Sequence, residues 1–339
     1  MAERDMARQL VDAVIADFPD HKRGTRPAHT IGIGAKGRFK ASPIARDWCH
    51  AEHFQGGEID ASVRFSNSSG SPDQHDGWSD ARGMATRFHL PGGAATDLIA
   101  MTLREFFSPT PEDFLAFAKA AIPRPVEPPN PWRKIGDMLR LFPPLPDPYP
   151  GQKTSSVGGS MAYAGLHSAS QLAAFDASFL GAPVSYARAT YNAVHTFIIT
   201  APDGTTRYVR FFWQPAAGVE MVDPKLSPVD DYLQSELRER IARWPVEFLL
   251  LMTVGEVGDP LNDPTKSWPL HRARINMGTL RLTEVPADQQ AHCEKLAFNP
   301  GRLTSGIAMS DDPILTARKA AYEVSREMRG GRACPFETQ

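Results

Sequence analysis

The stretch SDDPILTARKAAYEVSREMRGG, residues 310–331, carries the strongest helix signals in this sequence. Asp311 or Asp312 can cap the helix, and Pro313 suits its first turn. The apolar residues that follow recur at helical spacing, and two glycines close the stretch. The sequence therefore predicts a C-terminal helix over 311–330.

One face of this helix carries three cations and a phenol. Arg318, Tyr322, Arg326 and Arg329 follow one another at intervals of four, four and three residues. Such a stripe is commonly only a solvated basic face. A phenol one turn from an arginine is, however, favoured in its ionised form, and a phenolate is a good axial ligand for ferric haem. Guanidinium groups are also natural bidentate partners of the haem propionates.

A glycine-rich stretch near the N-terminus, PAHTIGIGAKGRFKASP at 27–43, fits the spacing of a dinucleotide-binding loop through Gly32, Gly34 and Gly37. That loop needs a buried strand before it and a helix that begins within it. The preceding residues are too polar for such a strand, and Pro43 ends any helix too early. We therefore expect the glycines to let a strand bend or to let a flat ligand approach the backbone.

Composition excludes several classes of protein. The chain has 339 residues and a formal net charge of −2, and its Lys and Arg residues are scattered, so nucleic acid is not an expected partner. The three cysteines, Cys49, Cys293 and Cys334, are far apart, which fits a reducing compartment. No apolar run approaches the roughly 20 residues of a membrane span, and the N-terminus lacks a signal-peptide core. We expect a cytoplasmic protein that binds no membrane.

Hydrophobic alternation predicts an antiparallel meander over 60–107, a second antiparallel group over 184–216, and two more strands after residue 245. Helices are expected at 111–121 and, capped, within 227–245. An N-terminal helix and arm fill 1–25, and a proline-rich excursion fills 123–153. This pattern is typical of one α+β body built mainly of strands.

Several stretches, taken in order, resemble the haem catalase superfamily, and in particular its short members, the catalase-related peroxidases. They span residues 26 to 329, nearly the whole chain, and the last is the most specific. These stretches are RPAHTIGIGAKGRF, VRFSNSSG, DARGMATRFHLPGG, FFSPTPEDF, VHTF and FNPGRLTSGIAMSDDPILTARKAAYEVSREMR.

The resemblance implies a catalase-like α+β fold with a closed antiparallel β-barrel of about eight strands and surrounding helices. A single domain would cover 1–339, with haem b between the barrel and the C-terminal helix. The catalytic residues it implies are His29, Ser66 and Arg318. His29 would be the distal histidine, and Ser66 would hydrogen-bond to it. The iron ligand would be Tyr322. The cofactor-binding residues that we expect are Arg26, Arg64, Phe107, Phe114, Tyr322, Arg326 and Arg329.

The sequence also departs from the family pattern. Met101 stands where catalases carry a distal asparagine, and Arg326 stands where they carry a histidine. The chain ends soon after Tyr322, without a helical C-terminal domain or long wrapping segments. We therefore expect a haem peroxidase that reduces hydrogen peroxide, organic hydroperoxides or both with a small-molecule electron donor, with weak catalase activity and a homodimeric state.

Two other classes of function stay open at this stage. The first is a haem-binding carrier or sensor, or a catalase-fold protein that converts lipid hydroperoxides. The second is a metal hydrolase that uses His29, His50, His53 or His75 with nearby acids. The spacing of these histidines matches no metal-binding helix pattern, which disfavours the hydrolase.

Overall fold

The computed structural model describes residues 2–78, 80–122, 160–223, 225 and 231–330. The excursion expected at 123–153 lies outside these residues. The strands are β1 (Gly32–Ala41), β2 (Glu58–Asn67), β3 (Arg82–His89), β4 (Ala95–Met101), β5 (Tyr191–Asn192), β6 (Phe197–Thr200), β7 (Thr206–Pro215), β8 (Val246–Val254), β9 (Arg274–Glu284) and β10 (Ile307–Met309). The α-helices are α1 (Ala2–Ala16), α2 (Ala45–Trp48), α3 (Pro111–Ala121), α5 (Ser160–Leu166), α6 (Ser168–Phe179), α7 (Tyr232–Arg243) and α8 (Pro313–Met328). Short 3₁₀ turns are η1 (Glu52–Phe54), η2 (Pro91–Gly93) and η3 (Tyr186–Arg188), and η4 (Gln290–Glu294) is a π-helical turn.

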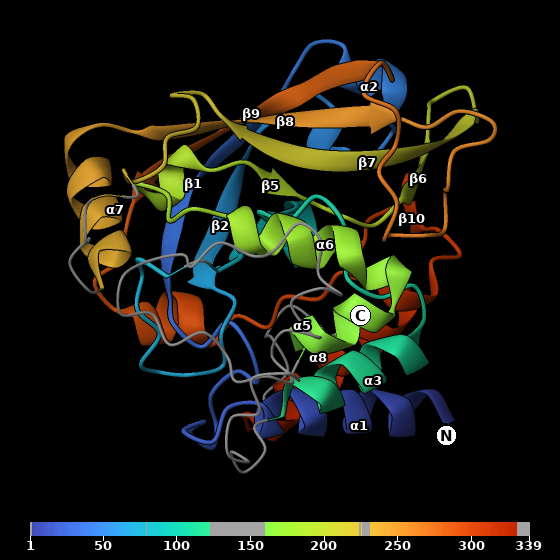
Figure 1. Ribbon diagram of the computed structural model, residues 1–339. Helices are drawn as coiled ribbons and strands as arrows, with labels where there is room; N and C mark the ends of the chain where they lie inside the picture. Colours follow the sequence, from blue (N-terminus) through green and yellow to red (C-terminus); the bar gives the residue numbers. More distant parts are fainter. Residues whose placement is uncertain (1, 79, 123–159, 224, 226–230, 331–339) are drawn as a thin grey trace, which may run out of the picture.

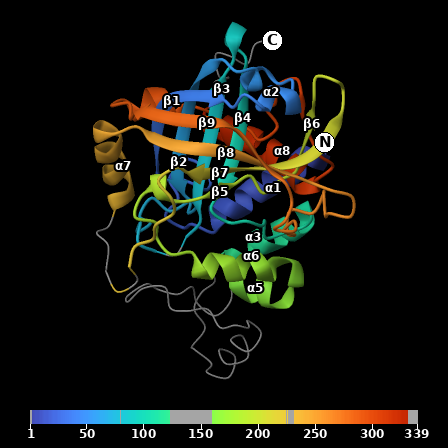
Figure 2. The ribbon, with the colours of Figure 1, turned by 90° about the horizontal axis from the view of Figure 1, so that it is seen from above.

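Eight antiparallel strands close on themselves to form a barrel (Figures 1 and 2). Their order around the ring is β1, β2, β3, β4, β5, β7, β8 and β9, and β9 pairs with β1 to complete it. Outside the ring, β6 pairs with the first half of β7 and carries β10 on its other side. Closure leaves the ring without the unpaired edges of an open sheet. The expected barrel of about eight strands is confirmed.

Aromatic side chains fill the inside of the barrel. Phe39, Phe88 and Trp213 come from three different strands, and each is at most 2% exposed. The ring of Phe39 meets the other two edge to face, with centroid separations of 5.0 and 6.2 Å. Phe65 and Phe248 belong to the same core. Such burial supplies much of the folding free energy. Because the interior is packed, a large ligand must bind outside the barrel.

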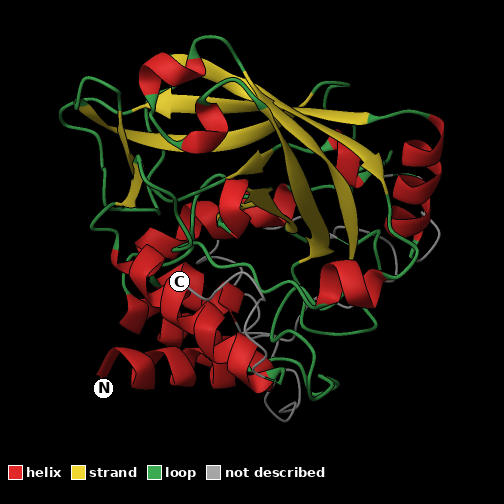
Figure 3. Cartoon of the chain, turned by 180° about the vertical axis from the view of Figure 1, so that it is seen from behind, coloured by secondary structure: helices red, strands yellow, loops and turns green. Residues whose placement is uncertain are grey.

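Three helices form a layer beside the barrel (Figures 1 and 3). Leu10 and Ala13 of α1 pack with Leu115 of α3 and Ala317 of α8 in one buried cluster. The alanines lack bulky side chains, so the three backbones approach closely. The predicted C-terminal helix is confirmed as α8, and Asp312 caps it by accepting a hydrogen bond from the Ile314 amide at 2.8 Å.

The helix predicted within 227–245 is α7, but its own sequence does not cap it. Asp231, which precedes its first residue, has a left-handed φ of 58° and makes no side-chain cap. Asp76, from the loop between β2 and β3, instead accepts a hydrogen bond from the Leu233 amide at 2.8 Å. The free amides of a helix start can be satisfied by any acceptor, and here the acceptor comes from a distant part of the chain.

The segment 184–200 is less regular than the strand prediction. It forms η3 and then only the short strands β5 and β6. β5 bridges β4 and β7 within the ring, whereas β6 pairs with β7 outside it. The chain must therefore leave the ring between them, and His195 lies in that connection.

The glycines at 32, 34 and 37 lie within β1 and serve chain packing. A Cβ at Gly34 would come within 2.4 Å of the Cys293 Cβ, and a Cβ at Gly37 within 1.9 Å of the Arg281 carbonyl oxygen. The pairing of β1 with β9 shifts register between Lys36 and Gly37, so the strand is irregular there, as expected. At all three glycines the position of a Cβ is taken up by neighbouring protein atoms, and the alternative expectation, that a flat ligand approaches the backbone here, stays a prediction.

We predict that Gly37→Ala lowers the free energy of unfolding by about 2–3 kcal/mol, because the new methyl group meets a backbone carbonyl that cannot rotate away. Urea unfolding measures the change. Gly57→Ala is the matched control, since a Cβ there meets nothing within 4 Å. Equal stability of the two variants would contradict this account of β1.

Candidate active site

A cavity between the barrel and the helical layer collects most of the predicted site residues. Its volume is about 370 Å³, within the range of small-molecule and cofactor pockets. Its walls come from α1, α3, α8, the segment before β1, and strands β2, β3 and β4. The predicted residues on its surface are Arg26, His29, Arg64, Ser66, Phe107, Phe114, Arg318, Tyr322 and Arg329. Arg326 is not among the residues that line it and instead faces a neighbouring hollow.

His29 is held in the cavity wall by its backbone and its ring. Its φ of 59° is left-handed, and its amide donates to the Ser68 carbonyl at 3.0 Å. The ring Nδ1 lies 3.0 Å from Ser66 Oγ. Burial, together with the positive charges of Arg64 and Arg318, lowers the pKa of His29 to about 4. The imidazole is therefore neutral at neutral pH and can accept a proton.

Gly83 of β3 makes room for this histidine, although the sequence analysis did not single it out. A Cβ at Gly83 would lie 2.8 Å from Ser66 Oγ and 3.0 Å from two atoms of the His29 ring. A larger residue would displace the imidazole or its partner. The available signal was a glycine inside a strand pattern, which often marks a close approach.

Tyr322 ends a chain of hydrogen bonds that starts at the cap of its own helix. Asp312 Oδ2 lies 2.6 Å from His195 Nδ1, and His195 Nε2 lies 2.7 Å from Arg318 Nη1. Arg318 then donates to the Tyr322 hydroxyl at 3.4 Å. Because a guanidinium can only donate, Nε2 is the acceptor and the imidazole proton sits on Nδ1, facing the carboxylate.

His195 and the second role of Asp312 were missed in the sequence. Burial lowers the pKa of His195 to about 4, although the hydrogen bond that its ring donates to Asp312 opposes this shift. The ring is therefore a neutral connector that fixes Arg318. Asp312 was recognised only as a cap, because nothing local reveals a partner 117 residues away.

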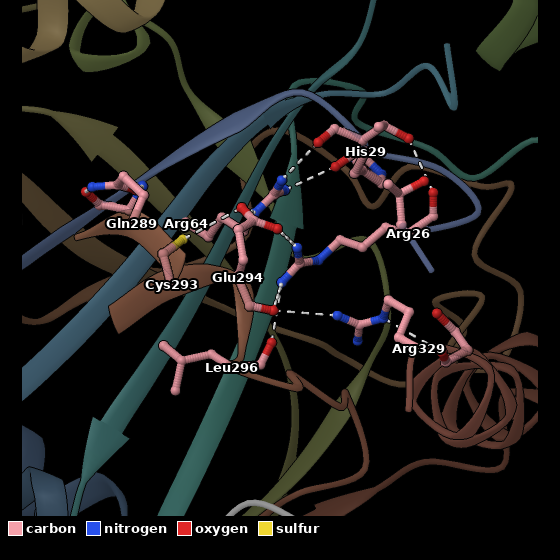
Figure 4. A network of polar contacts seen from close by, with 12 residues as sticks. Arg26, His29, Arg64, Gln289, Cys293, Glu294, Leu296 and Arg329 are labelled. Carbon is pink, nitrogen blue, oxygen red and sulfur yellow. Dashed lines mark hydrogen bonds and ion pairs between the residues drawn. The ribbon is translucent and has the colours of Figure 1, made fainter. Parts of the chain in front are cut away.

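The cationic edge of the cavity is a network centred on Glu294 (Figure 4). The Glu294 carboxylate forms ion pairs with Arg26 and with Arg64, the latter at 3.0 Å. Its backbone carbonyl accepts from Arg26 and Arg329 at 3.3 and 3.4 Å. Arg64 also donates to the backbone carbonyls of His29 and Thr30, at 2.9 and 3.1 Å.

Charge in this network is strongly coupled. Burial and the nearby charge of Arg64 lower the pKa of Arg26 to about 9, although Glu294 opposes both effects. For Glu294, burial raises the pKa, but Arg64 and Arg26 outweigh burial and hold the pKa below its usual value. Glu294 was not predicted, since an isolated glutamate gives no sequence signal.

Much of the cavity wall is apolar. Ile99, Met101, Leu103, Phe106 and Phe107 all line it. Among the described residues that line the cavity there is no Asn or Gln. Met101 lines the cavity, and its expected place at the position of a distal amide stays a prediction.

The chemistry of this cavity fits a haem. One space is lined by an imidazole, an arginine-linked phenol, a group of three guanidiniums and several aromatic rings. Gly83, where a side chain would strike His29, keeps the histidine side of the space clear. The described residues contain no cluster of three or more His, Cys, Asp or Glu that could hold a metal ion.

The barrel and its adjoining helices have the fold of solved catalase structures. A fungal catalase of known structure superposes with a TM-score of 0.73 at 23% identity, over 92% of this chain and 60% of that chain. The sequence model of the family Catalase matches residues 8–140 and 164–334. The chain belongs to the catalase family.

Shorter relatives match over most of their own length. A catalase-related peroxidase of Mycolicibacterium paratuberculosis is 31% identical over 325 residues, which are 95% of this chain and 94% of the relative. A catalase-related peroxidase of Synechococcus elongatus is 29% identical over 309 residues, 90% of this chain and 84% of the relative. The predicted resemblance to the short branch of the family is thereby confirmed.

The structure also bears on the predictions about membrane spans and cysteines. Within the described residues, no helix is both long and apolar enough to cross a membrane. Cys49 and Cys293 are buried free thiols, and Cys334 lies outside the described residues.

We predict that the free energy of unfolding decreases as the pH falls from about 6.5 towards 4. In the fold, His29 and His195 have pKa values of about 4, whereas unfolded histidines bind protons near 6.5. Protons therefore stabilise the unfolded chain across this window, by up to about 1.4 kcal/mol per pH unit for each histidine. Urea unfolding at a series of pH values measures the slope.

His29→Gln should reduce that slope, because it removes one of the titrating groups. His292→Gln, at an exposed position, is the control and should leave the slope unchanged. An unchanged slope in His29→Gln would show that the fold does not hold this imidazole neutral.

Proposed function

We propose that this protein is a haem-dependent peroxidase that reduces hydrogen peroxide, organic hydroperoxides or both with a small-molecule electron donor, and that its catalase activity is weak. The observation that carries the proposal is that His29 and the Arg318–Tyr322 pair line one cavity. The similarity to two catalase-related peroxidases over most of their length supports it.

Specific residues are proposed to hold the haem. Tyr322 would ligate the iron, and the guanidiniums of Arg26, Arg64 and Arg329 would pair with the propionates. The rings of Phe107 and Phe114, with centroids 5.2 Å apart in an edge-to-face arrangement, would pack against the macrocycle. Arg326 lies outside the cavity lining and is left out of this set.

When bound, haem supplies the iron at which the peroxide O–O bond is broken and the electrons are taken up. The protein must move one proton between the two peroxide oxygens. The proposed mechanism needs the ring proton of His29 on Nδ1, which lies 3.0 Å from Ser66 Oγ, so that Nε2 of the neutral ring is a base. It can accept the proton of the attacking oxygen and return it to the departing one, which is general acid–base catalysis.

Arg318 and His195 position the phenol of Tyr322, the second functional group of the cavity. Arg318 donates to the phenolic oxygen and so fixes the position of the proposed iron ligand. His195, anchored by Asp312, keeps Arg318 in this position. These residues are positioning groups, comparable to the outer partners that orient ligands in other metal sites.

The apolar residues that line the cavity favour hydroperoxides that carry an organic group. Met101 and its neighbours offer contact area but no hydrogen bond to orient a second hydrogen peroxide molecule. Disproportionation needs that second molecule, whereas a peroxidase draws its electrons from a separate donor. The net reaction is ROOH + 2e⁻ + 2H⁺ → ROH + H₂O.

Several finer features are also proposed. The cofactor would be haem b, and the active form a homodimer. A cytoplasmic location is proposed from the three scattered cysteines, because disulfides are rare in that compartment.

The proposal is tested on purified holoprotein by its absorption spectrum and by guaiacol oxidation with hydrogen peroxide and with an alkyl hydroperoxide. We expect a high-spin ferric tyrosinate spectrum and turnover with both oxidants. A haem spectrum without donor oxidation would instead indicate a carrier or sensor, or a protein that rearranges hydroperoxides.

We predict that His29→Ala retains haem but slows donor oxidation by about two to four orders of magnitude, because the proton shuttle is lost. Stopped-flow mixing with peroxide measures the rate. His50→Ala, at an exposed histidine that contacts Ser305, is the matched control. A full rate in His29→Ala would exclude the proposed role.

We predict that Tyr322→Phe changes the haem spectrum or leaves the protein without haem, because the ligand oxygen is removed. The pyridine haemochrome assay measures content. Tyr208→Phe removes a hydroxyl from a residue that is 37% exposed and should keep both spectrum and content. A wild-type spectrum in Tyr322→Phe would mean that another group binds the iron.

A further inference from the structure

A second, larger hollow adjoins the cavity. Its volume is about 1,390 Å³, and its walls come from β1, β2, β9, η4 and the end of α8. Arg26 and Arg329 line both the hollow and the cavity. The two spaces therefore share a wall.

That wall is the Glu294 network (Figure 4). Arg64 lines only the cavity, and Glu294 lines only the hollow. The carboxylate of Glu294 forms ion pairs with both Arg64 and Arg26, so these residues link the two spaces. Arg26 and Arg329 lie between the two spaces, since each residue lines both. A molecule in the hollow would therefore lie close to the edge where the propionates are proposed to bind.

The hollow carries a surplus of positive charge. Six basic side chains line it, against three carboxylates. Glu294 already pairs with Arg26 and Arg64, and Asp60 pairs with Arg38. The basic residues are Arg26, Lys36, Arg38, Lys295, Arg326 and Arg329.

Two lysines extend this charge away from the wall. Lys36 of β1 is partly buried, and its Nζ donates to His292 Nδ1 at 3.1 Å, which holds the ammonium group at the hollow. Lys295 is exposed and follows Glu294 directly. Neither lysine lines the cavity, so both can be changed without touching the proposed haem contacts.

We propose that this hollow is the binding site of the electron donor, and that it selects a small anionic reductant such as a carboxylate, enolate or sulfonate. This inference rests on the proposed peroxidase function. Each peroxide needs two electrons and two protons. Two donor anions bind in succession, each gives one electron across the Arg26–Arg329 wall, and each leaves as its one-electron oxidised product.

The experiment compares the double variant Lys36→Glu/Lys295→Glu with the wild type, both as holoprotein. The probe is the disulfonate donor ABTS, with neutral guaiacol as the reference donor. Calorimetry measures ABTS binding to the resting protein without peroxide, and steady-state kinetics give KM for both donors. Lys266→Glu, an exposed lysine outside the hollow, is the matched charge control.

We expect the double variant to weaken ABTS binding and raise its KM by about tenfold or more, since two attractive charges become repulsive. KM for guaiacol and for peroxide should stay within about twofold, and added salt should raise KM for ABTS in the wild type alone. Lys295→Gln, a milder change at an exposed residue, should give a smaller shift in the same direction and serves if the double variant misfolds.

Equal ABTS affinity in wild type, double variant and Lys266→Glu would overturn the proposal. So would a parallel rise in KM for guaiacol, or loss of a dimer in the double variant on sedimentation, which would make the hollow a contact between subunits. Failure of the wild type to oxidise any donor would refute the peroxidase function. The calorimetric comparison would still decide whether the hollow binds anions.

Discussion

The hydrogen bond between Asp312 and His195 is the constraint on which the rest of the site depends. One carboxylate oxygen of Asp312 caps α8, and the other holds the ring of a histidine from the connection between β5 and β6. That ring then fixes Arg318, and Arg318 contacts Tyr322. Asp312 therefore caps α8, links it through His195 to the barrel, and fixes Arg318 on the face of the helix that carries Tyr322.

Around His29, the geometry of the strands positions the side chains. Arg64 and Ser66 are alternate residues of β2, so both point to the same side of the sheet, and Gly83 pairs with Ser66 on the next strand. His29 lies before β1 in a left-handed conformation that is uncommon for a residue other than glycine. Hydrogen bonds from Arg64 to its carbonyl and from its amide to Ser68 hold it there.

Sequence reasoning succeeded where the determinants are local or carried by a long motif. The cap, proline and spacing of 311–330 predicted α8, and the alternation of 60–107 predicted β2, β3 and β4. It failed where a contact joins distant segments. Glu294 meets Arg26 across 268 positions, and His195 meets Asp312 across 117. The β1 glycines were recognised as special, but only the fold showed that they admit Cys293 and the backbone of Arg281.

Helix α1 forms part of the cavity wall without belonging to the barrel. α1 supplies Leu10, Val11 and Val14 to the cavity wall, yet it contributes no strand to the barrel and is fastened to α3 and α8 mainly by apolar contacts. Detaching it would uncover the cavity without breaking one hydrogen bond of the sheet. The apolar wall that α1 gives the cavity is therefore independent of the hydrogen bonds that hold the barrel closed.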